Sequence, residues 1–267
     1  MFKLIASDLD GTLLNSQKEI SEYSEKVLKE AVEKGVDFAV CTGRMYGSMQ
    51  YLMPKLSFSR YSINTMGAEI YDNFTKERIY SRPLEEEHTM MIAEYARDNK
   101  IHMNIYLDNV LYTNQMDDYV LWNYRETTSM AKEIEGVVLE FLKGKKVSKL
   151  VFISEPEESP KHFKAIEEML GGKINICASD PRFVECSHID ARKDKALMVL
   201  LDMLKLKKEQ LIVFGDSGND VTMLKNTGFS CCMANGWDEA KKAANVIVES
   251  NDDDGVARTV ERLILNR

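Results

Sequence analysis

Residues 2–14 read FKLIASDLDGTLL and indicate the fold of this chain. Residues 2–7 form a short apolar run, which is typical of a buried parallel strand. Asp8 and Asp10 follow at the strand end, where ligands bind in open α/β sheets. Because alternate strand residues share a face, both carboxylates are expected to start on one side. Such close charges repel unless a divalent cation neutralises them or one is protonated.

Strand and helix patterns alternate on both sides of the chain's middle. The amino-terminal part predicts a helix over 22–34, a buried strand over 36–41 and a helix over 45–56. The carboxyl-terminal part predicts helices over 193–205, 221–225, 238–244 and 255–265, and strands over 211–214, 229–233 and 246–248. This alternation predicts an α/β fold with a Rossmann-like parallel-sheet core.

The middle of the chain has a different pattern. It predicts helices over 84–99, 116–127 and 160–170, strands over 149–153, 174–178 and 183–186, and a hairpin around Asp108-Asn109. These elements suggest an α+β domain inserted into the first. We therefore predict a discontinuous core over 1–82 and 188–267, and an inserted cap domain over 83–187.

Three further polar motifs could hold phosphate or metal. Thr42 and Gly43 end the second strand, where a hydroxyl and a backbone N–H can cradle phosphate oxygens. Residues 215–220, GDSGND, follow the strand over 211–214, so their carboxylates also lie at a strand end. Residues 192–197, RKDKAL, offer a lysine that could neutralise a phosphoryl group. Taken singly, each motif also fits an ordinary turn or an exposed helix start.

Composition excludes several classes of protein. The 267 residues carry a net charge of -8, whereas a nucleic-acid partner usually requires a basic face. No apolar stretch approaches the roughly 20 residues of a membrane span, so we expect no membrane partner and a cytoplasmic location. The five cysteines and four histidines show no spacing of a zinc site, and the cysteines are expected to be reduced.

Together the four motifs resemble the haloacid dehalogenase (HAD) superfamily, in which they occur in this order. The resemblance is closest to the Cof-type branch, subfamily IIB, whose large cap is inserted between the second and third motifs. It implies phosphoryl transfer through an aspartyl-phosphate, with a cap that closes over the site.

The resemblance also implies a role for each motif residue. Asp8 would be the nucleophile, and Asp10 would protonate the leaving oxygen and then activate water. Mg²⁺ would be the cofactor, held by Asp8, Asp216 and the carbonyl oxygen of Asp10. Asp220 would position the lysine or a metal-bound water. The phosphate ligands would be the Leu9 N–H, Thr42, Gly43, Lys193 and Asn219.

Two positions depart from the family pattern. Asp194 stands where the family often has glycine, so either Lys193 or Lys195 could be the phosphate lysine. We choose Lys193 because Ala196-Leu197 then fits the family register. Met66 stands where the family often has asparagine, which leaves the substrate contact at that position open.

The predicted function is a magnesium-dependent phosphatase of small phosphomonoesters, such as sugar phosphates or phosphorylated cofactors. A phosphomutase with the same chemistry is one alternative, and a non-catalytic binding protein for phosphate ligands is another. The sequence leaves the physiological substrate and the oligomeric state open.

Overall fold

A computed structural model describes residues 1–116, 131–178 and 181–266. Contacts between residues divide the chain into two compact units. The first comprises residues 1–43, 52–80 and 192–267, and the second comprises residues 44–51 and 81–191. All but the first residue of the predicted helix over 116–127 lies outside the described residues.

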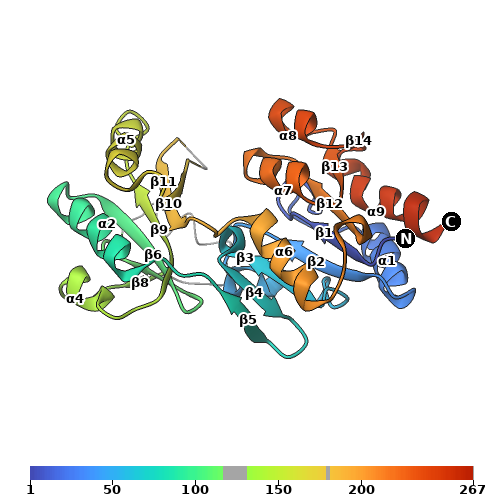
Figure 1. Cartoon of the computed structure of the whole chain (residues 1–267), viewed down its shortest axis with the longest axis horizontal. Coiled ribbons are helices and arrows are strands. Elements are labelled where there is room, and N and C mark those ends of the chain that lie inside the picture. Colours follow the sequence, from blue (N-terminus) through green and yellow to red (C-terminus); the bar gives the residue numbers. More distant parts are fainter. Residues whose placement is uncertain (117–130, 179–180, 267) are drawn as a thin grey trace. The chain divides into compact units, whose positions relative to one another are not determined.

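The first unit is built on an eight-stranded sheet with the order β14-β13-β12-β1-β2-β3-β4-β5 (Figure 1). Its strands are β1 (Leu4–Ser7), β2 (Asp37–Cys41), β3 (Tyr61–Asn64), β4 (Glu69–Asp72), β5 (Glu77–Ser81), β12 (Leu211–Gly215), β13 (Phe229–Met233) and β14 (Val246–Val248). Strands β14 to β3 pair in parallel, and β4 is antiparallel to β3. The predicted parallel-sheet core is therefore confirmed.

Strand order reverses at β1. The chain goes outward from β1 through β2 and β3 on one side, and through β12, β13 and β14 on the other. Ligands of open α/β sheets bind at the carboxyl ends of the strands beside such a switch point. The sheet therefore places the segments after β1 and β12 where a ligand site is expected.

Helices cover both faces of this sheet because successive strand residues point to opposite sides. They are α1 (Glu22–Glu33), α6 (Lys193–Met203), α7 (Val221–Asn226), α8 (Asp238–Ala243) and α9 (Gly255–Val260). Leu4 and Ala6 of β1 share a core cluster with Leu197 and Leu200 of α6. On the other face, α1 and α9 pack against each other, and α1 contacts β2 (Figure 1).

The predicted helix over 45–56 is wrong. The structure has only a 3₁₀ helix, η1 (Gly47–Leu52), in this region. Met49, Leu52 and Leu56 are buried at a helical spacing, which explains the misleading pattern. Pro54 has no N–H and disfavours helical geometry at the preceding residue, so an α-helix cannot continue to Leu56.

Other boundaries differ less. The predicted helix over 255–265 is α-helical only as far as Val260 and continues as a π-helical turn, Glu261–Leu265. Strands β4 and β5 were not predicted from the sequence. The remaining 3₁₀ helices are η2 (Thr65–Gly67), η3 (Lys208–Gln210), η4 (Gly218–Asp220) and η5 (Asn251–Asp253).

The second unit contains a six-stranded sheet with the order β10-β11-β9-β6-β7-β8. Its elements are β6 (His102–Leu107), β7 (Val110–Thr113), β8 (Lys132–Glu133), β9 (Val147–Ile153), β10 (Ile174–Cys177), β11 (Phe183–His188), α2 (Glu86–Asp98), α4 (Val138–Leu142) and α5 (Ser159–Leu170). All pairs except β7/β8 are antiparallel. The predicted hairpin is confirmed, since Asp108 and Asn109 join β6 to β7 with φ of 48° and 62°.

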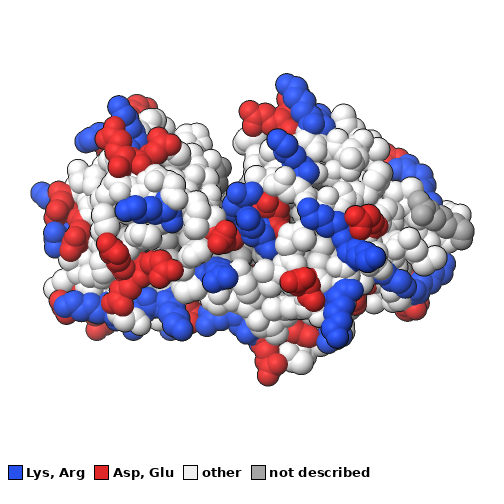
Figure 2. Space-filling view, in the orientation of Figure 1, with Lys and Arg blue, Asp and Glu red and all other residues white. Residues whose placement is uncertain are grey.

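Charged side chains of both signs lie on the surface. On the face seen in Figure 2, acidic and basic side chains are interspersed. Among the described residues, no helix is both long and apolar enough to cross a membrane.

Candidate active site

Two carboxylates meet at the carboxyl ends of β1 and β12. Asp8 follows β1 directly, and its N–H donates to the carbonyl oxygen of Phe214 at 3.0 Å, which extends the parallel ladder by one residue. Asp216 follows β12 directly. Both side chains are largely buried. The pairing of two parallel strands thus brings together residues from opposite ends of the sequence.

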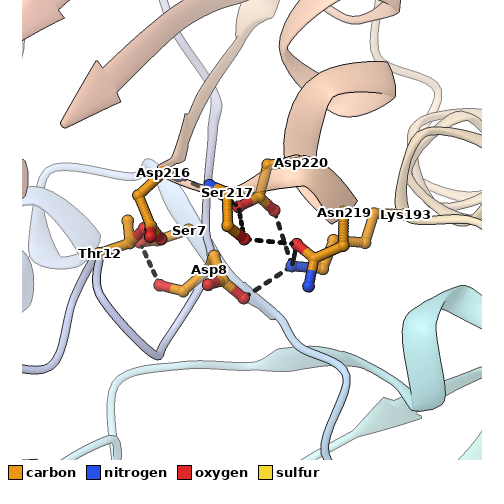
Figure 3. Close-up of polar contacts among 8 residues, drawn as sticks. All are labelled: Ser7, Asp8, Thr12, Lys193, Asp216, Ser217, Asn219 and Asp220. Atoms are coloured by element: carbon orange, nitrogen blue, oxygen red, sulfur yellow. Dashed lines mark hydrogen bonds and ion pairs between the residues drawn. The ribbon is translucent and has the colours of Figure 1, made fainter. Parts of the chain in front are cut away.

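Lys193, the first residue of α6, lies between the carboxylates of Asp8 and Asp220 (Figure 3). Its Nζ is 2.7 Å from Asp8 Oδ1 and 2.7 Å from Asp220 Oδ1. Asn219 Oδ1 also accepts a hydrogen bond from Nζ at 3.2 Å. Only 1% of Lys193 is exposed, so its ammonium group is paired inside the protein.

Asp220 is fixed by backbone groups as well as by Lys193. Its Oδ2 accepts hydrogen bonds from the N–H groups of Asp216 and Ser217, at 3.1 Å and 3.2 Å. Gly215 makes this approach possible, because a Cβ on it would lie 2.6 Å from the Asp220 Cβ. Asp220 therefore shapes the 215–220 loop and places the Lys193 ammonium beside Asp8.

Thr12 is a site residue to which the sequence analysis assigned no role. Its hydroxyl donates to Asp216 Oδ1 at 2.6 Å (Figure 3). A small hydroxyl residue after the glycine of the D-x-D-G motif was the available signal. Only the tertiary structure shows that the hydroxyl reaches a carboxylate from another strand.

The carboxylates form a group that could hold a cation. One oxygen from each of Asp8, Asp216 and Asp220 lies within 4.8 Å of the others, and all three residues are buried. Asp10 is outside this group. Its side chain is 38% exposed, and its Oδ1 accepts a hydrogen bond from Lys18 Nζ at 3.1 Å.

Asp8 and Asp10 differ in backbone structure and in their contacts. Strand β1 ends at Ser7, and Asp10 instead forms an isolated bridge with Leu14. Strand alternation therefore no longer applies at Asp10. The two carboxylates lie in different surroundings, one buried against Lys193 and the other partly exposed beside Lys18.

Burial dominates the electrostatics of the group. It raises the pKa of Asp8 to about 8, although Lys193 acts in the opposite direction. Burial also raises the pKa of Asp216 to about 6, against the hydrogen bond from Thr12. For Lys193 burial opposes the charged form, but Asp220 and Asp8 outweigh it and raise the pKa. Lys193 pairs with two of the three buried carboxylates, so a bound divalent cation would complete the charge balance.

The other predicted phosphate ligands lie on neighbouring segments of the same unit. Leu9 is buried directly after Asp8, and Thr42 is buried directly after β2. Gly43 packs closely on Met66, because a Cβ on Gly43 would lie 2.9 Å from Met66 Sδ. The Met66 N–H donates to the Thr42 carbonyl oxygen at 3.2 Å, so the ends of β2 and β3 are tied together.

The two lysines of the third motif differ in their surroundings. Lys193 contacts Asp8, whereas Lys195 is exposed. Asp194 accepts hydrogen bonds from the Arg192 guanidinium, at 3.0 Å and 2.7 Å, and from Asn226 Nδ2 at 3.0 Å. Asp194 thus holds the start of α6 in place, which accounts for an acidic residue beside the site lysine.

We predict that Gly11→Ala impairs the site far more than Gly35→Ala. Both glycines have left-handed backbones, with φ of +78° and +82°. A Cβ on Gly11 would lie 2.6 Å from Asp216 Oδ2, whereas a Cβ on Gly35 would meet nothing within 4 Å. Each variant should lose about 1 kcal/mol of stability from backbone strain.

Only Gly11→Ala should also displace Asp216, and we expect kcat/KM to fall roughly tenfold or more. Phosphate release and thermal unfolding of both variants would check this. Equal activity of the two variants would contradict the close packing of Gly11 on Asp216.

Comparison with known proteins agrees with this geometry. The sequence model described as haloacid dehalogenase-like hydrolase matches residues 5–260. The chain is 30% identical to YxeH of Bacillus subtilis (strain 168) over 272 residues, which cover 99% of both chains. It is 29% identical over 294 residues to the 5-amino-6-(5-phospho-D-ribitylamino)uracil phosphatase YwtE of the same organism, with 98% of both chains covered.

Solved structures show the same similarity. A haloacid dehalogenase-like hydrolase from Bacteroides thetaiotaomicron aligns with a TM-score of 0.88 and 31% identity, covering 98% of this chain and 100% of that one. The HAD subclass IIB sugar phosphatase BT4131 aligns with a TM-score of 0.83 and 20% identity, covering 97% of this chain and 98% of that one. At this identity the second alignment shows only the shared fold.

Proposed function

This chain belongs to the haloacid dehalogenase-like hydrolases and is a phosphatase of that family, and we propose that it hydrolyses small phosphomonoesters through an aspartyl-phosphate at Asp8 with the help of Mg²⁺. The observation that carries the proposal is the buried contact of Lys193 with Asp8 and Asp220 beside Asp216. We also propose residues 1–82 and 188–267 as the catalytic core and residues 83–187 as the inserted cap.

Asp8 is the proposed nucleophile. An Oδ of Asp8 attacks phosphorus, the bond to the ester oxygen breaks, and the leaving group departs with that electron pair. Water then attacks the mixed anhydride, releases inorganic phosphate and regenerates the carboxylate. Lys193, 2.7 Å from Asp8 Oδ1, stabilises the ionised nucleophile and faces the charge of the incoming phosphate.

The donor set fits magnesium. Asp8 and Asp216 offer carboxylate oxygens at adjacent strand ends, and Mg²⁺ prefers a few carboxylates completed by water and substrate phosphate. We propose Asp8, Asp216 and the carbonyl oxygen of Asp10 as its protein ligands. When bound, the cation would neutralise the carboxylates and polarise the phosphate.

The remaining roles concern the leaving group and the phosphate oxygens. The Asp10 side chain protonates the departing ester oxygen and later takes a proton from the attacking water. Its side chain is 38% exposed, so it can be reached from solvent. The Leu9 N–H, Thr42, Gly43, Lys193 and Asn219 are the proposed ligands of the phosphate oxygens.

The proposed substrates are small phosphomonoesters, namely sugar phosphates or phosphorylated cofactors. YwtE, by its name, acts on a phosphorylated ribitylaminouracil, and BT4131 is named a sugar phosphatase. Both names describe a phosphate on a polyol or sugar. This supports the same class of substrate for the present chain.

Phosphate release from a panel of sugar phosphates, nucleotides and phosphorylated cofactors tests the proposal. The assay is run with Mg²⁺ and with EDTA, and products are separated so that isomerised sugar phosphates are detected. We expect release with Mg²⁺ and its loss with EDTA. Isomerised product without free phosphate would point to a mutase, and activity unchanged by EDTA would exclude the magnesium role.

We also predict that the metal-free protein loses stability as pH rises. The folded-state pKa values of Asp8 and Asp216, about 8 and about 6, lie above the ordinary value of 3.8. Between the ordinary pKa and the raised folded-state pKa of each group, the folded state binds more protons than the unfolded state. The free energy of unfolding therefore falls as pH rises through that interval. Each group contributes a slope of up to about 1.4 kcal/mol per pH unit in its window. Lys193 adds nothing there, because its raised pKa acts only above about 10.

Thermal unfolding in EDTA at pH 5 and pH 8 measures this effect. We expect Tm to be lower at pH 8, Asp8→Asn to reduce the difference, and Mg²⁺ to raise Tm more at pH 8 than at pH 5. A wild-type Tm that rises with pH, with no effect of Asp8→Asn, would contradict the buried carboxylate group.

A further inference from the structure

The turn over residues 11–14 follows Asp10 and sets the direction of the chain there. Leu14 and Thr12 donate their N–H groups to the Leu9 carbonyl oxygen at 2.8 Å and 3.3 Å. Asp10 forms a bridge with Leu14. The position of the Asp10 backbone therefore depends on this turn.

The ion pair of Asp10 with Lys18 lies at the surface. Lys18 Nζ lies 3.1 Å from Asp10 Oδ1, but 56% of the lysine side chain and 38% of the aspartate side chain are exposed. Exposed ion pairs of this kind contribute roughly 0–1 kcal/mol. The backbone of the turn, through the Asp10–Leu14 bridge, also contributes to the position of Asp10.

Two asparagines from distant segments bind both ends of this turn. Asn235, after β13, donates from Nδ2 to the Gly11 carbonyl oxygen at 2.8 Å. Asn251, after β14, donates from Nδ2 to the Leu14 carbonyl oxygen at 2.9 Å. The Asn251 N–H donates to Asn235 Oδ1 at 3.0 Å, which links the two asparagines.

The amide orientations follow from these partners. The Asn235 oxygen must face the Asn251 N–H, so its NH₂ group faces the Gly11 carbonyl oxygen. The Asn251 NH₂ group is likewise the only part of its amide that can donate to Leu14. Aspartate has the same shape as asparagine but no such donor, so it removes the bond and adds a negative charge opposite the carbonyl oxygen.

We propose that Asn235 and Asn251 are positioning residues that hold the turn after Asp10, and through it place Asp10 to protonate the leaving oxygen. This rests on the proposed function of Asp10. The two asparagines touch only backbone atoms of the turn and each other in these bonds. They thus act through Asp10, and their loss should matter most for substrates that need a proton donor.

Leaving-group dependence separates this role from simple structural support. An alkyl phosphate expels an alkoxide, which needs a proton, whereas p-nitrophenyl phosphate expels a stable anion. The value of kcat/KM reports only the steps through the first irreversible one, here transfer of the phosphoryl group to Asp8. It therefore excludes the later hydrolysis step, in which the leaving group has already departed.

The experiment compares the wild-type enzyme with Asn235→Ala, Asn251→Ala and the isosteric Asn235→Asp and Asn251→Asp at saturating Mg²⁺. Glycerol phosphate and p-nitrophenyl phosphate are the substrates. We expect kcat/KM for glycerol phosphate to fall roughly tenfold or more, a part of the 10²–10⁴ typical of general acid catalysis. For p-nitrophenyl phosphate we expect a change below about threefold, because no proton is needed.

Ser16→Ala is the matched control. The Ser16 hydroxyl donates to Asp252 Oδ2 at 2.6 Å. This bond joins the residue after Asn251 to the segment that follows the turn, but it does not bind the turn over 11–14 itself. This variant should keep the wild-type ratio between the two substrates. Equal losses for both substrates in the asparagine variants, or no loss for either, would overturn the inference. No release by the wild-type enzyme from either ester would overturn the proposed function and the inference with it.

Discussion

Asp8→Asn is expected to lower phosphate release by about 10⁴-fold or more while leaving the protein folded, because an amide oxygen cannot form the phosphorylated intermediate at a useful rate. The substitution keeps the shape of the side chain and an oxygen that can accept from Lys193. It also removes the carboxylate of Asp8, whose pKa is raised by burial. The folded state should therefore be preserved.

Two measurements complete this test. Mass spectrometry of acid-quenched wild-type enzyme should find one phosphoryl group on the peptide that contains Asp8, and none in Asp8→Asn. Asp72→Asn is the control, since Asp72 is also largely buried and pairs with Arg60, with Nε to Oδ2 at 3.2 Å, but belongs to β4 away from the site. Retained turnover by a pure Asp8→Asn preparation would exclude Asp8 as the nucleophile.

Lys193→Ala is expected to have the second largest effect. It leaves Asp8 and Asp220 buried without the ammonium that lies 2.7 Å from each. Breaking a buried ion pair by removing one partner costs about 3–5 kcal/mol. Removing a charge that stabilises the transferring phosphoryl group should also lower kcat by about 10²–10³-fold.

Lys195→Ala is the comparison that decides the position of the phosphate lysine. Lys195 is exposed two residues after Lys193, and its loss should change activity less than twofold. Lys193→Met keeps much of the side-chain volume and tests activity if Lys193→Ala does not fold. A larger loss in Lys195→Ala than in either Lys193 variant would show that the lysine was assigned to the wrong position.

The sequence determined the core of the fold because its signals are local. Leu4, Ile5 and Ala6 are apolar and aspartates follow soon after, and this pattern marks a buried strand that ends at a polar site. Strands β13 and β14 have the bounds that the apolar runs predicted. The helix predicted over 45–56 failed because burial at helical spacing also fits a 3₁₀ helix, and Pro54 limits its length.

The sequence also determined which residues could carry the chemistry. Asp8, Asp216 and Lys193 were identified from motifs at strand ends and at a helix start. The tertiary structure brings these three into one buried group, since Lys193 contacts Asp8 and the oxygens of Asp8 and Asp216 lie together. Motif residues reveal their chemical type, but their mutual distances depend on which strands pair.

Only the tertiary structure decided the surroundings of the remaining site residues. Thr12 reaches Asp216, and Asn235 reaches the Gly11 carbonyl oxygen, across long intervals of sequence. Strand β1 ends at Ser7, and beyond it Asp8 is buried against Lys193 whereas Asp10 is partly exposed beside Lys18. A sequence pattern records the period of a local element, whereas hydrogen bonds between strand ends depend on sheet order, and that order is set by how the whole chain packs.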